Sequence, residues 1–180
     1  MPRRRRVYIP GISSHVFLRG HNCAVIFRDG ADCDRFLWIV RLAAAHCGVA
    51  IHGFSVMSTH YHLIATPSSA TALPDAMQWI DGEYTKYHNR RYERLGTAWC
   101  ARYSAKLLTD ERYWLTCLKY VEKNPVAAGI VTHAELYPWS SYRVHAAGAP
   151  NAWLTSHPLY DALGSTPAER QAAYRAICAD

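Results

Sequence analysis

Two histidines separated by one residue, His60 and His62, have the types and spacing to support metal chemistry. In a β-strand, residues i and i+2 point to the same face, so the two imidazoles could converge on one ion. Imidazole is the commonest metal-binding side chain near neutral pH. Two histidines on the solvent face of a strand would give the same string, so the motif alone is a weak signal.

A second pair, Tyr120 and Asn124, is spaced four residues apart in a segment expected to be helical. Residues i and i+4 share one helix face, so the two side chains should project together. A tyrosine hydroxyl can act as a nucleophile, and an amide oxygen can bind Mg²⁺ or Mn²⁺. Tyr113 and Cys117 lie on the same stripe, so core packing also explains the pattern.

Together these four residues would form a coherent phosphodiester site. A divalent metal held by His60, His62 and Asn124 would polarise a scissile phosphate while Tyr120 attacks phosphorus. The product would be a phosphotyrosine link, which keeps the bond energy for rejoining the strand. A metal-bound water could cleave the same bond without the tyrosine, so a phosphoesterase is a separate alternative.

The elements that must position these residues follow from hydrophobic periodicity and from Gly and Pro. Strands are expected over residues 15–21, 49–56 (broken by Gly53), 60–66 and 99–108, and helices over 29–47, 73–91, 109–124 and 167–178. The helix after the fourth strand should begin at an N-cap, Thr109, and stop near Pro125. Tyr61 and Leu63 should face the core. This order predicts an α+β sandwich, a mostly antiparallel sheet with helices packed on it.

The composition fits one domain with one core in 180 residues. Residues 1–145 carry all the motifs, and residues 146–180 form a tail with one helix. The chain has no apolar stretch of membrane-spanning length and no apolar signal core, so we expect no membrane partner and no secretion. Its six cysteines form no CxxC pair, which indicates reduced thiols in a cytoplasmic protein.

The formal net charge is +6 and the pI about 9.1, and most of the cations are arginine. A basic domain of this size indicates a polyanionic partner, most simply nucleic acid. The run Arg3, Arg4, Arg5 and Arg6 could lie along a phosphate backbone, although a solvated tail would look the same.

Five strings in a fixed order make the chain resemble a known family. They are RRRRVYIPG from Arg3, HVFLRGHN from His15, FSVMSTHYHLIATP from Phe54, YVEKNPVAAGIV from Tyr120 and YPWSSY from Tyr137. The set resembles the REP-associated tyrosine transposases, a branch of the HUH single-strand transposase (IS200-like) family, over about residues 3–142.

The resemblance implies a ferredoxin-like sandwich with Tyr120 as nucleophile, His60, His62 and Asn124 as metal ligands, and Mg²⁺ or Mn²⁺ as cofactor. Members of this family recognise palindromic hairpins in single-stranded DNA, cleave close to the stem, and leave a 5′-phosphotyrosine and a free 3′-hydroxyl. This branch resembles monomers, and the implied location is the bacterial cytoplasm, associated with the nucleoid.

Arginine contacts to DNA are also implied by the resemblance. The arm formed by Arg3, Arg4, Arg5 and Arg6 should meet the hairpin or its flanking bases. Further candidates for phosphate contacts are Arg19, Arg90, Arg91 and Arg102.

The chain departs from the family where the first histidine is approached. The family usually has Pro-Asn there, whereas this chain has Ser58-Thr59. The ligands remain, but the start of the strand could differ. This departure motivates an alternative function, a hairpin DNA-binding protein with little or no catalysis.

Overall fold

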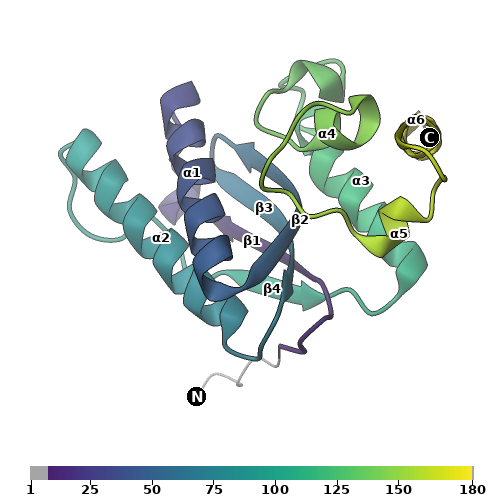
Figure 1. Ribbon diagram of the computed structural model, residues 1–180. Helices are drawn as coiled ribbons and strands as arrows, with labels where there is room; N and C mark the ends of the chain where they lie inside the picture. The colour runs from purple at the N-terminus through teal and green to yellow at the C-terminus, as the bar shows by residue number, and fades with distance from the viewer. Residues whose placement is uncertain (1–7, 180) are drawn as a thin grey trace.

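A four-stranded antiparallel sheet in the order β2-β3-β1-β4 forms the centre of the structure, a computed structural model that describes residues 8–179 (Figure 1). The strands are β1 (Ser14–Arg19), β2 (Val49–Met57), β3 (His60–Pro67) and β4 (Ser104–Leu107). Helix α1 (Gly30–Cys47) joins β1 to β2, and α2 (Ala72–Arg91) joins β3 to β4. This βαββαβ order is ferredoxin-like, so the predicted α+β sandwich is confirmed.

The chain continues past the sheet with a second group of helices. In Figure 1, α1 and α2 lie side by side over the sheet, and the later helices gather beyond β2. The later elements are α3 (Glu111–Ala127), α4 (Tyr142–Ala147), α5 (Pro158–Asp161) and α6 (Pro167–Ala179), with the short 3-10 turns η1 (His21–Cys23) and η2 (Ala134–Leu136). Within residues 8–179, no helix is long and apolar enough to cross a membrane.

Alternating side chains of β3 divide the core in two. Tyr61 and Leu63 are fully buried in the cluster that the sheet shares with α1 and α2, which confirms that they face the core. Ile64 belongs instead to a second cluster with Leu118 and Val121 of α3. Because side chains alternate along a strand, the face that carries Ile64 also carries His60 and His62.

A close approach of backbone and helix sets the position of α3 on the sheet. A Cβ atom at Gly53 would lie 2.5 Å from Leu118 Cδ1, so any larger residue here would force the Leu118 side chain to shift. The sequence predicts that Gly53 breaks this strand, but β2 runs through Gly53 without a break. The pairing with β3 shifts register between Ile51 and Gly53, which is a β-bulge inside a continuous strand.

A buried carboxylate ties α3 to the C-terminal helices. Glu122 is fully buried. Its Oε1 accepts hydrogen bonds from Ser141 Oγ and from His145 Nδ1 (2.7 Å), and its Oε2 accepts one from Tyr174 OH (2.6 Å). Two of these donors come from α4 and its N-cap and one comes from α6, so the carboxylate ties both helices to α3, and losing a donor would leave a buried carboxylate incompletely hydrogen-bonded.

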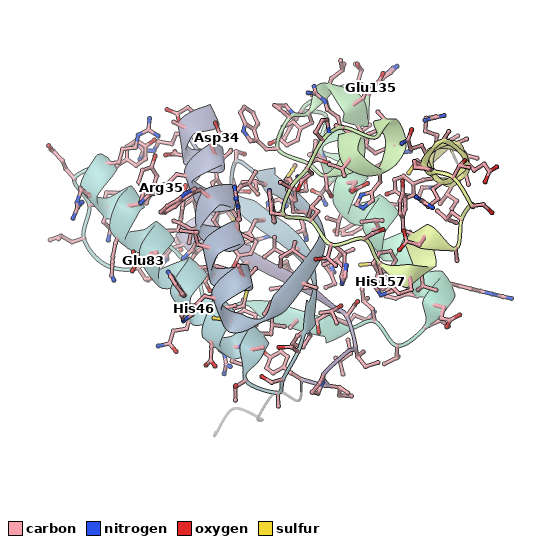
Figure 2. The ribbon with its side chains drawn as sticks, in the orientation of Figure 1. Asp34, Arg35, His46, Glu83, Glu135 and His157 are labelled. Carbon is pink, nitrogen blue, oxygen red and sulfur yellow. The ribbon has the colours of Figure 1, made fainter. Side chains whose placement is uncertain are left out.

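The segment after α4 also packs on α3 and on the sheet. His157, which precedes α5 (Figure 2), stacks on Trp114 of α3 with ring centroids 4.0 Å apart. The outer edge of β2 is hydrogen-bonded to residues on both sides of α4. These bonds run from Val56 N to Trp139 O (2.9 Å), from Ser141 N to Phe54 O (3.0 Å) and from Thr155 N to Ile51 O (2.8 Å).

The fourth strand is shorter than the sequence indicates, since only Ser104–Leu107 of residues 99–108 is a strand. Trp99 forms a single bridge with Gly20, and its indole donates to Asp81 O at 3.0 Å. The segment before β4 therefore bonds only to the end of β1, from Cys100 N to Arg19 O (3.0 Å), and leaves the ladder between this bridge and Ser104, with the Trp99 side chain buried in the core.

Both predicted ends of α3 were wrong by a few residues. The N-cap is Asp110 and not Thr109, because the Asp110 side chain accepts from Tyr113 N at 2.8 Å. The helix also continues through Pro125. Proline removes only one N–H donor here, its ring is buried, and the Pro125 carbonyl is satisfied by Ile130 N at 2.9 Å.

Candidate active site

The four residues predicted to do chemistry meet between β3 and α3. Asn124 Nδ2 lies 3.5 Å from His62 Nε2, and the Asn124 side chain also hydrogen-bonds His60. The rings of His60 and His62 are 5.1 Å apart between centroids, and those of His62 and Tyr120 are 5.8 Å apart. Spacing of two in a strand and of four in a helix therefore brings the set together.

Each histidine is held through its Nδ1 atom. His62 Nδ1 lies 2.9 Å from His15 Nε2, and His60 Nδ1 lies 3.0 Å from Thr59 Oγ1. An imidazole that binds an ion through Nε2 carries its proton on Nδ1 and donates it to a neighbour. His15 and Thr59 can both accept such a bond, which would fix the ring orientation and the tautomer.

Burial keeps both histidines neutral near pH 7. Burial, together with the nearby His15, His60 and Arg19, lowers the pKa of His62 to about 3. Burial and the charge of Arg19 also lower the pKa of His60, while the Asn124 hydrogen bond opposes this shift. Neutral imidazole is the form that binds metals.

The nucleophile candidate is accessible, unlike the histidine beside it. The Tyr120 side chain is 54% exposed, whereas His62 is only 5% exposed. A phosphodiester can therefore reach the phenol from solvent while the histidines stay fixed beneath it.

The donor set is compatible with a divalent cation. Two imidazole nitrogens and one amide oxygen can bind Mn²⁺ or Mg²⁺, with water or phosphate oxygens completing the shell. Among residues 8–179 there is no cluster of three or more His, Cys, Asp or Glu side chains that could hold an ion, and the candidate set here combines two histidines with the amide of Asn124. The amide oxygen would face the histidines after a half-turn of this side chain.

The arginines predicted to contact DNA are spread over the molecule. Arg19 lies opposite His60 in the β1–β3 register and is exposed, so it stands beside the site. Arg90 and Arg102 are exposed on α2 and ahead of β4, and the Arg102 guanidinium lies 5.6 Å over the Tyr103 ring. The arm from Arg3 to Arg6 lies outside the described residues.

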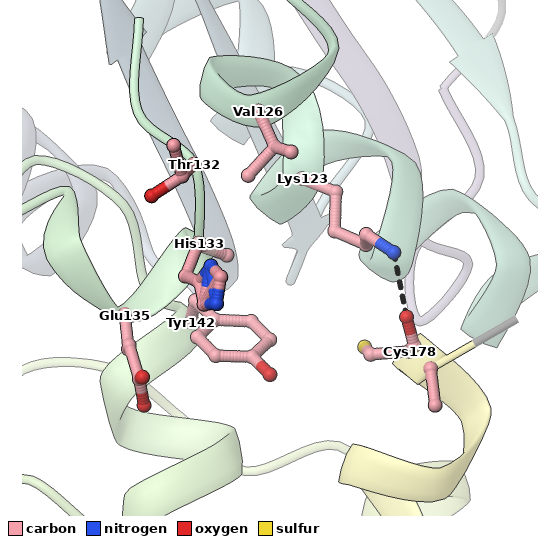
Figure 3. Close-up of a pocket in the computed structure, with 9 residues that line it drawn as sticks. Lys123, Val126, Thr132, His133, Glu135, Tyr142 and Cys178 are labelled. Carbon is pink, nitrogen blue, oxygen red and sulfur yellow. Dashed lines mark hydrogen bonds between the residues drawn. The ribbon is translucent and has the colours of Figure 1, made fainter. Parts of the chain in front are cut away.

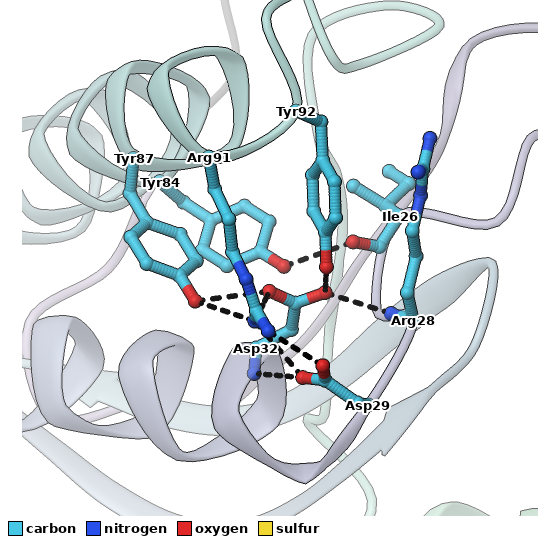
Figure 4. Close-up of polar contacts among 8 residues, drawn as sticks. All are labelled: Ile26, Arg28, Asp29, Asp32, Tyr84, Tyr87, Arg91 and Tyr92. Carbon is cyan, nitrogen blue, oxygen red and sulfur yellow. Dashed lines mark hydrogen bonds and ion pairs between the residues drawn. The ribbon is translucent and has the colours of Figure 1, made fainter.

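Arg91 is engaged within the protein. Its guanidinium pairs with Asp29 at 2.6 Å and with Asp32, whose side chain is fully buried (Figure 4). Asp32 also accepts from Tyr87 OH (3.0 Å) and Tyr92 OH (2.7 Å). The network joins the start of α1 to the end of α2, so Arg91 has a structural partner that the sequence did not reveal.

Two residues of the site, His15 and Thr59, were not singled out from the sequence. The alternation in HVFLRG indicated the strand, but only the pairing of β1 with β3 brings His15 against His62. Thr59 was noted only as a departure from the family pattern. Its contact with His60 gives this departure a physical role.

A cavity lies away from the four candidate site residues. It has a volume of about 410 Å³ and lies between α3, the segment from Thr132 to Glu135, and α6 (Figure 3). Lys123 Nζ, on its wall, donates to Cys178 O at 2.6 Å. None of the four site residues lines this cavity, so volume alone does not mark the chemistry.

Among solved structures, the chain resembles a REP-associated tyrosine transposase bound to a REP hairpin. The TM-score is 0.67 at 16% identity, covering 87% of this chain and 93% of that one, which shows a shared fold. A putative transposase from Deinococcus radiodurans R1 also matches, with a TM-score of 0.47 at 16% identity over 64% of this chain and 92% of that one, too low to support an argument. No curated protein sequence matches significantly.

The sequence profile of the family described as "Transposase IS200 like" matches residues 9–124. This match spans more than half of the chain and includes β1 to β4 and most of α3. All four candidate site residues fall within it. The chain therefore belongs to the IS200-like transposase family.

Proposed function

We propose that this chain is a metal-dependent single-stranded DNA endonuclease and strand transferase that binds REP-type hairpins and cleaves through a 5′-phosphotyrosine intermediate. The observation that carries the proposal is the meeting of His60, His62 and Asn124 beside the accessible phenol of Tyr120. A nucleophile next to a cation-binding set is the arrangement that phosphodiester transfer requires.

In the proposed reaction, Tyr120 Oη forms a bond to phosphorus while the bond from phosphorus to the 3′ oxygen breaks. The phenol gives up its proton, and the departing 3′ oxygen takes one up to become a free hydroxyl. A bound Mg²⁺ or Mn²⁺ would polarise the phosphate and offset the charge that builds on its oxygens. Attack by another 3′-hydroxyl on the phosphotyrosine reverses these bond changes and joins a new strand.

The proposed partner is single-stranded DNA with a palindromic hairpin, bound by one protomer. The solved REP-associated transposase is described as bound to a REP hairpin, and this chain shares its fold. The net charge of +6 suits a phosphate backbone. Arg19 is placed to meet phosphate next to the scissile bond, and the arm from Arg3 to Arg6 is proposed to reach the hairpin.

A binding protein without catalysis remains the second candidate, motivated by Ser58-Thr59. The contact between Thr59 Oγ1 and His60 Nδ1 weakens this motivation, because it supplies the acceptor that a metal-binding histidine needs. The two candidates differ in whether a covalent protein–DNA adduct forms.

The test is incubation of the protein with labelled hairpin DNA and Mg²⁺ or Mn²⁺, followed by a denaturing gel. We expect a metal-dependent adduct for the wild type and none for Tyr120→Phe. Tyr113→Phe is the matched control, since Tyr113 is exposed on the same stripe of α3 and loses only its hydroxyl. Cleavage that survives in Tyr120→Phe would favour a metal-bound water, and hairpin binding without any adduct would favour the binding protein.

A further inference from the structure

A second cavity lies directly beside the candidate nucleophile. It has a volume of about 250 Å³ and is lined by His15, Tyr113, Thr116, Cys117 and Tyr120. We call it the Tyr120 cavity. Pockets for drug-sized ligands begin at about 300 Å³, so this one suits a single flat ring system.

The walls of the Tyr120 cavity come from one stripe of α3. Tyr113 and Tyr120 are 39% and 54% exposed, and the small side chain of Cys117 lies between them on the helix. The imidazole of His15 meets the Tyr120 ring edge-on, with centroids 6.0 Å apart. Partly exposed aromatic rings around a hollow form a surface on which an unpaired base can stack.

The polar groups at the Tyr120 cavity suit a nucleotide. Thr116 Oγ1 donates to Arg112 O at 3.1 Å, which leaves its oxygen lone pairs able to accept from a base. Lys106 Nζ lies 3.1 Å from Tyr113 OH and 4.5 Å from the centre of that ring. The cavity therefore has a cation at its edge and no acidic residue among the five that line it.

The order of residues along α3 relates the Tyr120 cavity to the scissile bond. Tyr113 and Cys117 precede Tyr120, and Asn124 follows it, so Tyr120 stands between the cavity and the candidate metal site. A strand whose phosphate lies at Tyr120 has an adjoining base within reach of the cavity.

We propose that the Tyr120 cavity binds one unpaired nucleobase, that of a nucleotide adjoining the scissile phosphate. This rests on the proposed function and deepens it, because the cavity would then select which phosphate is presented to Tyr120. Stacking on the tyrosine rings supplies affinity, and Thr116 contacts the edge of the base.

The test is fluorescence anisotropy in EDTA, which prevents cleavage. The probes are a hairpin with a single-stranded flank across the mapped cleavage position, the same DNA lacking either adjoining base, and the hairpin without a flank. For the wild type, removing one of the two bases should weaken binding about 10-fold. In Thr116→Leu, which fills the cavity from an exposed position, the intact flank should bind as weakly as the abasic one. Binding of the hairpin without a flank should not change.

Tyr113→Ala, which removes a wall of the cavity, should give the same loss if Thr116→Leu fails to fold. The matched control is Thr132→Leu, which alters the 410 Å³ cavity and should keep the 10-fold preference. Equal wild-type affinity for intact and abasic flanks would overturn the proposal. A preference for the intact flank that persists in Thr116→Leu and Tyr113→Ala would also overturn it, as would loss of this preference in Thr132→Leu. Failure of the proposed function is distinct, because then no metal-dependent adduct forms.

Discussion

Replacing His15 by leucine tests whether a buried neighbour of the site controls metal binding. His15 is 9% exposed, and its Nε2 lies 2.9 Å from His62 Nδ1. Leucine fills similar space but cannot accept a hydrogen bond. In His15→Leu, the His62 ring loses the acceptor that keeps the proton on Nδ1 and leaves Nε2 available to an ion.

The expected magnitude follows from the geometry of this single contact. Removing a hydrogen-bond partner of a metal-binding histidine costs about 10- to 100-fold in metal affinity, or about 1.4 to 2.7 kcal/mol. A buried donor left without an acceptor costs about 1 to 3 kcal/mol, which is the same range. We therefore expect the Mn²⁺ concentration for half-maximal adduct formation to rise at least about 10-fold.

The assay combines this Mn²⁺ titration with hairpin affinity measured in EDTA and with a thermal melt. The affinity for the hairpin without a flank should stay within about twofold, because His15 does not carry the positive charge that binds phosphate and the Tyr120 cavity that it lines is proposed to hold a base of the flank. His15→Gln is the control, since its side-chain oxygen can replace Nε2 as acceptor and should restore most of the metal affinity. A folded His15→Leu protein with an unchanged Mn²⁺ requirement would refute the reasoning.

Three further predictions concern stability and DNA contact. Burial lowers the pKa of His62 to about 3 and that of His15 to about 4, so below pH 6.5 the unfolded chain takes up protons that the folded chain does not. Stability should therefore fall between pH 6.5 and 4, by about 1.4 kcal/mol per pH unit for each histidine, and denaturant midpoints equal at pH 7 and 5 would contradict this. Arg91→Ala should lower the free energy of unfolding without changing hairpin affinity, since it leaves a buried carboxylate without its cation. Arg19→Ala should instead weaken hairpin binding and leave the free energy of unfolding unchanged, and it should reduce the salt dependence of binding by about one ion. Anisotropy and thermal melts measure the two quantities, and a loss of hairpin affinity in Arg91→Ala or a loss of stability in Arg19→Ala would contradict these expectations.

Local patterns were enough to predict the parts of the site that depend on one element at a time. Strand alternation placed His60 and His62 on one face, and helical spacing placed Tyr120 with Asn124. Strand and helix order was enough to predict the α+β sandwich, because each hydrophobic run has only one way to bury its apolar face.

Contacts between distant segments could not be predicted in the same way. The bond from His15 to His62 depends on strand register, and the ion pair of Arg91 with Asp32 joins residues 59 positions apart. The passage of α3 through Pro125 depends on burial of that ring against other elements. Local propensity carries no information on such partners.

The hydrogen bonds along the outer side of β2 affect how copies of this protein behave toward one another. An unpaired strand offers a row of N–H and C=O groups to any chain that can add to it, and self-association or aggregation often begins there. Here Trp139, Ser141 and Thr155 already bond to part of that row, and β4, on the opposite border, is only four residues long. These bonds occupy part of the row that a strand of another copy would need, which opposes extension of the sheet from one copy to the next.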